Sequence, residues 1–165
     1  MQNLQEASAL SAVLGNAGLT GLSGAATTYS TSAVPVSING VVTTNGANSG
    51  AATPTTNSTS AAALTVTAPA TGHKAALVVW TVDTGGTERI RSDGFVTSLS
   101  GAEIILDFPD IPATEVPFAY HTLKAGTTVS GTWTFGSSNW NATGMTVGTV
   151  VNCSMIPHPS VVSVS

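Results

Sequence analysis

The residues of this sequence with the clearest potential for chemistry are two aspartates in the stretch DFPDIP. Asp107 and Asp110 lie three positions apart, and Glu103 and Glu115 are close by. Two carboxyl groups held near one another can share general acid and general base work, as in glycoside hydrolysis. Three prolines punctuate the same region, however, and proline fixes φ and removes a backbone donor. We therefore interpret it as a rigid, solvated connector between sheets, and rank a hydrolase that uses the two aspartates last among the functions considered.

Nucleophilic and metal-dependent chemistry lack their usual patterns. Cys153 is alone, so no internal disulfide can form, and nothing in its local sequence would activate the thiol. Ser23 in GLSGA does not form a nucleophile elbow, because the second glycine falls one position early. His73, His121 and His158 are scattered without the paired spacing of a metal site. We therefore predict a protein that is not an enzyme, with no metal site and no cofactor.

A sugar-binding face is another chemistry that the sequence could support. The stretch GTWTFGSSNWNATG (131–144) holds two of the three tryptophans and no charged residue. Trp140 and Tyr120 could stack on sugar rings, and Asn139 and Asn141 could hydrogen-bond to their hydroxyl groups. Aromatic residues make up only 5% of the chain, however, and a core also needs them. These four residues are the candidates for surface recognition in the alternative function given below.

The same stretch is also typical of a β-strand with one buried face. Val129, Trp133 and Phe135 share one parity, and successive strand residues point to opposite faces. Hydroxyl side chains occupy the other parity. We predict that Trp133 and Phe135 belong to a core, and that Trp140, beyond the turn, packs back on the hairpin or at a subunit contact.

The composition narrows the class of protein. Charged residues are 7% of the chain, against about 25% in an ordinary globular protein. Instead the chain has 26 threonines and 19 serines. Threonine and valine favour pleated surfaces, and serine, glycine and asparagine favour turns. The composition therefore predicts an all-β fold with a neutral, hydroxyl-rich surface, which suits burial in an assembly.

Several other classes are disfavoured. Only four residues are basic, so clustered contacts to nucleic-acid phosphates are not expected. No run of about 18 apolar residues could cross a membrane. The first residues lack a basic segment followed by a continuous apolar segment, so no secretory signal is expected and the chain is predicted to be made in a cytoplasm.

Strand and turn signals run along most of the chain. Residues 34–44 predict a hairpin, because Asn39-Gly40 is the strongest short hairpin signal. Residues 45–60 are poor in large apolar side chains and predict a loop or an extended strand that another subunit could order. Short candidate strands at this spacing favour an antiparallel sandwich or a jelly-roll-like barrel. The candidate strands are 63–68, 75–83, 87–91, 94–99, 103–107, 118–124, 128–135 and 145–152.

The chain divides into three zones. Residues 1–24 are expected to be an extended N-terminal docking arm, in which LQEASALSAVLG could form a short helix. Residues 25–70 are an extended or hairpin segment, and residues 71–165 are the β-sandwich body. The arm carries apolar side chains whose exposure to solvent would be unfavourable, and they are therefore candidate anchors. These candidates are Leu4, Leu10, Leu14, Leu19 and Leu22.

Five motifs in this order resemble small virion structural proteins of tailed bacteriophages. They are ATTYSTS (26–32), INGVVTT (38–44), NSGAATPTT (48–56), PFAYHTLKAGTT (117–128) and FGSSNWNATGMT (135–146). The resemblance covers most of residues 20–150 and is partly compositional. It implies a β-rich oligomer anchored by an N-terminal arm, serving as a capsid decoration (cement) protein or as a head or tail fibre subunit. It supplies no functional residues.

The function expected from the sequence is therefore non-enzymatic. We expect a homo-oligomer, with a trimer as the favoured state, that decorates or cements a bacteriophage capsid shell and resides on the virion. Its partner would be the major capsid protein or another virion protein, with no nucleic acid and no membrane. The alternative is a head or tail fibre or adhesin subunit that contacts host surface glycans.

Overall fold

The protein is an all-β sandwich. Its computed structural model describes residues 11–153 and 161–164. Within these ranges every regular element is a strand, and no helix is present that is long and apolar enough to cross a membrane. The strands are β1 (Ala12–Val13), β2 (Thr28–Thr31), β3 (Val34–Ile38), β4 (Val41–Asn45), β5 (Asn48–Ala52), β6 (Thr65–Thr67), β7 (His73–Asp83), β8 (Glu88–Arg91), β9 (Val96–Ser98), β10 (Ile104–Asp107), β11 (Glu115–Gly126), β12 (Thr132–Thr134), β13 (Met145–Val147), β14 (Val151–Asn152) and β15 (Val161–Val164).

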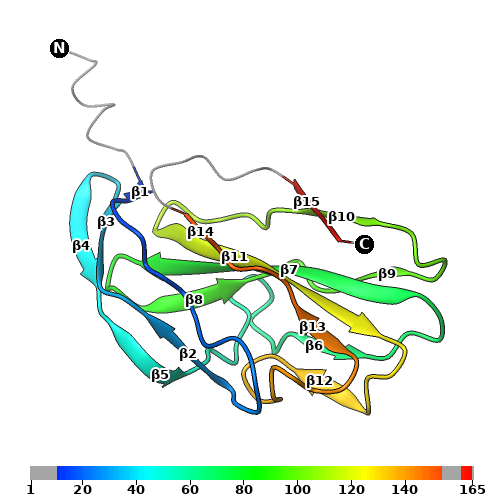
Figure 1. The fold of residues 1–165 in the computed structure, drawn as a ribbon. Coiled ribbons are helices and arrows are strands. Elements are labelled where there is room, and N and C mark those ends of the chain that lie inside the picture. The colour runs from blue at the N-terminus through cyan, green and yellow to red at the C-terminus, as the bar shows by residue number, and fades with distance from the viewer. Residues whose placement is uncertain (1–10, 154–160, 165) are drawn as a thin grey trace.

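A six-stranded antiparallel sheet forms the centre of the molecule (Figure 1). Its order is β13-β11-β7-β8, with β14 also paired to β11 and β9 also paired to β7. A three-stranded sheet, β1-β3-β4, and the pairs β2–β5, β6–β12 and β10–β15 complete the described topology. The predicted all-β fold is thus confirmed as a sandwich, since no described sheet closes on itself into a barrel.

Strand β7 is buried on both faces. Val78, Trp80 and Val82 face the main core, and Leu77 and Val79 face a smaller core on the opposite side. The smaller core lies under β10 and β15, which cover that face of the central sheet (Figure 1). Burial on both faces explains why AALVVW is a continuous apolar run rather than an alternating one.

A β-bulge adjusts β11 to both cores. The register with β7 shifts between Pro117 and Ala119, so Phe118 is an extra residue on the β11 side. Phe118 and Ala119 both contribute to the main core, and Tyr120 then joins the smaller core. Proline is tolerated in a strand at a bulge because a ladder hydrogen bond is already lost there. The predicted connector is therefore wrong at its C-terminal end, where Glu115 and Pro117 already belong to β11.

The predicted hairpin at 34–44 is confirmed. Asn39 and Gly40 have φ values of 51° and 78°, as a type I′ turn between two strands requires. The segment 45–60 is ordered by this chain, so the suggestion that it needs another subunit is wrong. Strand β5 pairs with β2, and the side chain of Asn57 both donates to Ser92 O at 2.8 Å and accepts from Ser92 N at 3.0 Å.

The described part of the N-terminal zone packs within the sandwich. The described part of the predicted helix is wrong: Ala12 and Val13 pair with β3 as a strand. Leu19 and Leu22 are 2% and 6% exposed and belong to the main core, to which residues 25–70 and the predicted body also contribute. The prediction that these two leucines anchor the protein to another protein is therefore wrong. Leu14 is exposed at 39%, whereas Leu4 and Leu10 lie outside the described residues.

His121 is a buried ionisable group inside the main core. It has no exposed surface, and its ring stacks on Phe135 and meets Trp140 edge-on. Nδ1 lies 3.2 Å from Thr122 O, and Nε2 has no hydrogen-bond partner among the described residues. Burial disfavours the charged form strongly and outweighs the Thr122 carbonyl, lowering the pKa of His121 to about 4.

This burial predicts acid sensitivity. Between an ordinary histidine pKa of about 6.5 and the folded value of about 4, the unfolded state binds more protons, so falling pH favours unfolding. We expect the free energy of unfolding to fall by about 1.4 kcal/mol per pH unit in this window, about 3 kcal/mol near pH 4, measured by denaturant titration. His121→Leu should flatten the slope whatever its own stability. An unchanged slope would assign the acid sensitivity to other groups.

Candidate functional site

The predicted recognition aromatics are not on the surface. Trp140 is 2% exposed and packs against Phe135 at a ring-centroid distance of 5.1 Å and against Trp133 at 6.1 Å. Tyr120 is 9% exposed and meets Phe108 edge-on. The prediction that these two residues stack on sugar rings is therefore wrong. The predicted core positions of Trp133 and Phe135 are confirmed.

Trp140 instead holds the start of the 25–70 segment in place. Its indole Nε1 donates to Thr28 O at 3.1 Å, and its backbone N donates to Ala26 O at 3.3 Å. The next residue, Asn141, donates from its backbone N to Gly24 O at 3.1 Å. Asn139 and Asn141 are exposed, so of the four predicted recognition residues only the two asparagines face solvent.

The predicted carboxylate pair does not form an enclosed site. Asp107 ends β10, Asp110 follows in the loop, and both are exposed, as is Glu103. None of these three side chains has a hydrogen bond or ion pair within the described residues. Glu115 is separate from them and is buried in a polar network with two arginines.

The centre of this network is a bidentate ion pair at the end of the central sheet. Arg91 on β8 donates from Nε and Nη2 to the two carboxylate oxygens of Glu115, both at 2.7 Å. Thr81 on β7 donates its hydroxyl to Glu115 Oε2 at 2.6 Å. Arg91 also donates to Ser58 O at 3.3 Å. Burial would raise the pKa of Glu115, but hydrogen bonds from Arg91 and Thr81 outweigh it and hold that pKa below its ordinary value.

Two further carboxylates lie near this network, and Asp83 joins it through Arg89. Asp83 accepts from Arg89 Nη2 at 2.8 Å, and its other oxygen accepts the backbone N–H groups of Gly85 and Thr87, each at 2.9 Å. Glu88 accepts from Thr31 and from the amide of Asn45, and so ties β8 to β2 and β4. Burial, followed by the nearby Glu88, raises the pKa of Tyr29. Both oxygens of Asp83 and Glu115 accept hydrogen bonds, whereas Glu88 Oε2 is buried without a partner among the described residues. The bonds that these carboxylates make hold neighbouring strands and turns in position.

The network makes a measurable contribution to stability. We expect Glu115→Gln to lower the free energy of unfolding by about 3 kcal/mol, because it leaves the Arg91 guanidinium largely buried without its counter-charge. Equilibrium unfolding in urea measures this change. Asp110→Asn is the control, since its exposed carboxylate should change stability by less than about 0.5 kcal/mol. Equal effects of the two substitutions would contradict a structural role for the pair.

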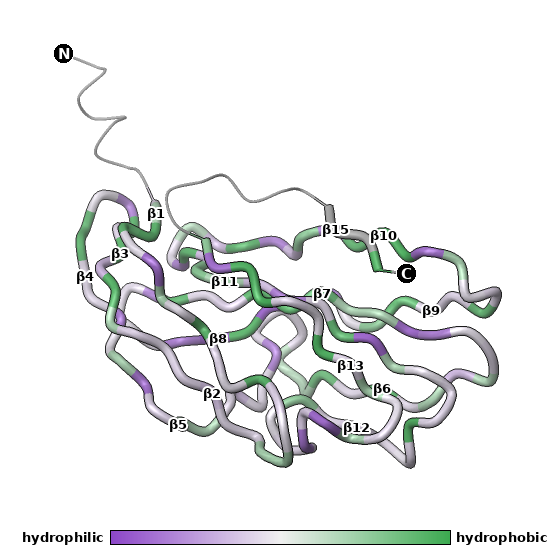
Figure 2. The backbone as a smooth tube through the Cα atoms, in the orientation of Figure 1, coloured by the Kyte–Doolittle hydropathy of each residue, from purple (hydrophilic) through white to green (hydrophobic). Residues whose placement is uncertain are grey.

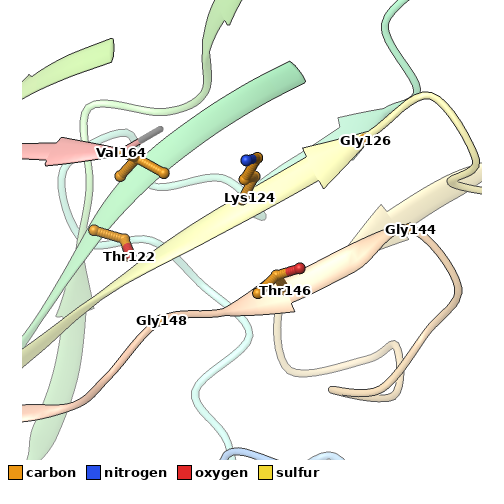
Figure 3. A pocket seen from close by; sticks show the side chains of 7 residues that line it. All are labelled: Thr122, Lys124, Gly126, Gly144, Thr146, Gly148 and Val164. Atoms are coloured by element: carbon orange, nitrogen blue, oxygen red, sulfur yellow. The ribbon is translucent and has the colours of Figure 1, made fainter. Parts of the chain in front are cut away.

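A shallow groove of about 300 Å³ lies over β11 and β13 (Figure 3). Thr122 and Lys124 come from β11, Thr146 comes from β13, and Val164 approaches from β15. Three glycines complete the lining; they are Gly126, Gly144 and Gly148. The groove offers hydroxyl groups and one ammonium group, and its volume is at the lower end of the range for small-molecule sites.

The glycine lining reflects close packing of the backbone. Gly144 has a φ of 81°, and a Cβ there would lie 2.5 Å from Val129 N. Gly24 has a nearly identical φ of 82° but no atom within 4 Å of such a Cβ. The two positions therefore share a positive φ and differ in the space available.

This difference gives a matched test. We expect Gly24→Ala to cost about 1 kcal/mol of unfolding free energy, which is the cost of a left-handed backbone alone. Gly144→Ala should cost about 3 kcal/mol, since the added methyl group also clashes with the Val129 backbone. Thermal and urea unfolding of both variants measure the difference. A difference near zero would mean that the strands around Gly144 can separate.

The remaining chemical candidates are isolated. Cys153 packs against the smaller core, and burial raises the pKa of its thiol to about 11, which keeps it protonated and unreactive. His73 and His121 are buried, and His158 lies outside the described residues. In the described ranges, no three histidine, cysteine or acidic side chains gather at one point where they could hold a metal ion.

The ion-pair network was missed by sequence reasoning. Arg89 and Arg91 alternate on one predicted strand, which places them on the same face. That signal was present, but it does not identify the acidic partner, which follows Arg91 by 24 positions.

The fold and these sites define a β-sandwich with a buried polar network and, over β11 and β13, a shallow groove lined largely by glycine and threonine. No family model, no curated protein and no solved structure matches this chain.

Proposed function

We propose that the protein is a non-enzymatic structural subunit of a bacteriophage particle, which decorates or cements the capsid shell as a homo-oligomer. The observation that carries this proposal is the open edge of the β1-β3-β4 sheet. Val41 and Val42 of β4 are exposed at 68% and 62%, and adjacent strand residues point to opposite faces. Figure 2 shows the outer strand β4 with a hydrophobic stretch at this edge of the molecule.

The edge lacks the features that keep most edge strands apart. Such strands are usually blunted by lysine, proline, a bulge or a covering segment. Strand β4 reads VVTTN, its pairing with β3 is regular, and among the described strands it pairs with β3 alone. Around Val41 and Val42 its outer side is therefore open to strand addition by another chain, with a valine on each face to bury, whereas Gly86 lies close to Thr44 O at the other end of the strand.

The distribution of charge supports the same proposal. After Lys124 the sequence has no charged residue, and serine and threonine hydroxyls dominate the polar surface. A surface of this kind generates little repulsion between neighbouring subunits. The resemblance of five sequence motifs to small virion structural proteins of tailed bacteriophages supports the choice of a phage shell, with the major capsid protein or another virion protein as partner.

The glycan-binding alternative loses its basis. It depended on aromatic rings that could stack on sugars, and both proposed rings, Trp140 and Tyr120, are buried. The exposed Asn139 and Asn141 alone offer hydrogen bonds of a kind found across this surface. We therefore do not pursue a fibre or adhesin role.

The copy number in purified virions tests the proposal. In particles from the source of this sequence, we expect about one copy per shell subunit or per local symmetry axis, measured by quantitative mass spectrometry against the major shell protein. A ratio matching a single vertex or a tail would favour a fibre. Absence from the particles would overturn the virion role.

The β4 edge is tested in the same particles. Val42→Lys should weaken rebinding to particles stripped of the protein at least tenfold, because it adds a charge to the pairing edge. Val151→Lys, which changes another exposed valine on β14, is the matched control. Equal rebinding of the two variants would exclude this edge as the contact, even if the protein is a shell component.

A further inference from the structure

A second, smaller groove lies between β9 and β10. Its volume is about 100 Å³, which suits a single side chain and is below the range of about 300–1,000 Å³ for small-molecule sites. Leu77 and Leu106 are buried and form an apolar base, whereas Val96 and Ile105 are exposed at 50% and 67%. The groove is therefore an apolar slot open to solvent.

Two carboxylates line this slot. Asp93 precedes β9, Asp107 ends β10, and both are exposed. Neither side chain has a hydrogen bond or an ion pair within residues 11–153 and 161–164. Two negative charges beside exposed apolar side chains are thus left without a counter-charge in this chain.

The sequence around the slot also has an excess of acidic over basic residues. Between Arg91 and Lys124 there are five acidic residues and no basic residue. One of the five, Glu115, is neutralised by Arg91. The other four carboxylates are exposed and unpaired within the described structure. They are Asp93, Glu103, Asp107 and Asp110.

We propose that the slot between β9 and β10 binds a lysine or arginine side chain from an extended segment of another protein. The aliphatic stem of such a side chain would lie on Val96 and Ile105 while its charged end reaches Asp93 and Asp107, as long basic side chains do at apolar surfaces. Small apolar residues flanking the basic one would cover the exposed rim. The charge, the size and the apolar lining of the slot all match this occupant.

A second copy of this chain is a poor occupant. Of its four basic residues, Arg89 and Arg91 are held by Asp83 and Glu115. Lys74 is half-buried on β7, with its Nζ 3.4 Å from the Thr67 hydroxyl, and Lys124 is half-buried in the groove over β11 and β13. All four cations thus already have neighbours in this chain, and we therefore assign the complementary cation to a different protein. The inference rests on the proposed function only in taking this partner to be a shell protein.

A short peptide tests the slot without a virion. The probe is acetyl-Thr-Val-Lys-Val-Thr-amide, titrated into the full chain and followed by NMR. We expect shift changes confined to residues 93–96 and 105–107, and affinity that falls as salt rises. The same peptide with norleucine in place of lysine should bind at least tenfold more weakly. Equal binding of the two peptides, or no binding of either, would overturn the proposal.

Two double variants separate the slot from general acidity. Asp93→Asn/Asp107→Asn should weaken lysine-peptide binding about tenfold, because two ion pairs are lost. Glu103→Gln/Asp110→Asn removes the same charge outside the slot and should leave binding unchanged. Equal loss in both variants would mean long-range attraction only. All four side chains are exposed, so both variants should unfold at the wild-type urea concentration.

A metal ion is the competing occupant of two carboxylates. Calorimetry with calcium chloride should show no binding that depends on Asp93 and Asp107. Calcium binding lost in the Asp93→Asn/Asp107→Asn variant would overturn the proposal in favour of a cation site. Peptide binding by a protein that proves absent from virions would leave the slot intact and reject the shell role alone.

Discussion

The pairing of β7 with β11 is the interaction on which the rest of the structure depends. It runs antiparallel from His73 opposite Gly126 to Asp83 opposite Glu115, interrupted only by the bulge at Phe118. Both faces of this ribbon are buried, one by the main core and the other by β10 and β15. The short strands around it, most of two to five residues, bury their apolar side chains largely against this ribbon and could not do so alone.

The position of the ion-pair network follows from this arrangement. A ribbon buried on both faces leaves charged groups only near its ends, and Thr81, Asp83 and Glu115 lie together at one end. A buried ion pair is a weak source of net stability, but it penalises wrong pairing strongly. If β8 slipped by one residue, Arg91 would turn to the other face and leave Glu115 buried without its cation. The network therefore selects the register of β8 against β7.

Local signals in the sequence were sufficient for most of the fold. The Asn39-Gly40 dipeptide located a hairpin, and the parity of Val129, Trp133 and Phe135 identified a buried strand face. Each depends on neighbouring residues alone. Strand boundaries were less accurate for β11, where Pro117 sits at a bulge that only the pairing with β7 explains.

Features that depend on distant residues could not be predicted. Leu19 and Leu22 are apolar in any interpretation, but the sequence does not say whether they enter this chain's core or that of a partner. Trp140 follows a polar turn, and its burial depends on Thr28, which lies 112 positions earlier. Asp107 was grouped with Asp110 because they are close in sequence, whereas the fold places it in one slot with Asp93.

The covering of the smaller core by β15 bears on how the chain is made. Ile104 and Leu106 of β10 pack over Leu77 and Val79. The described pairing partner of β10 is β15. Residues 161–164 therefore have to leave the ribosome before this side of the central sheet can close. Until then, during synthesis at about 5–20 residues per second, an apolar sheet face stays exposed to solvent. Slow pairing of distant strands lengthens this interval, so nascent chains would be natural clients for a chaperone.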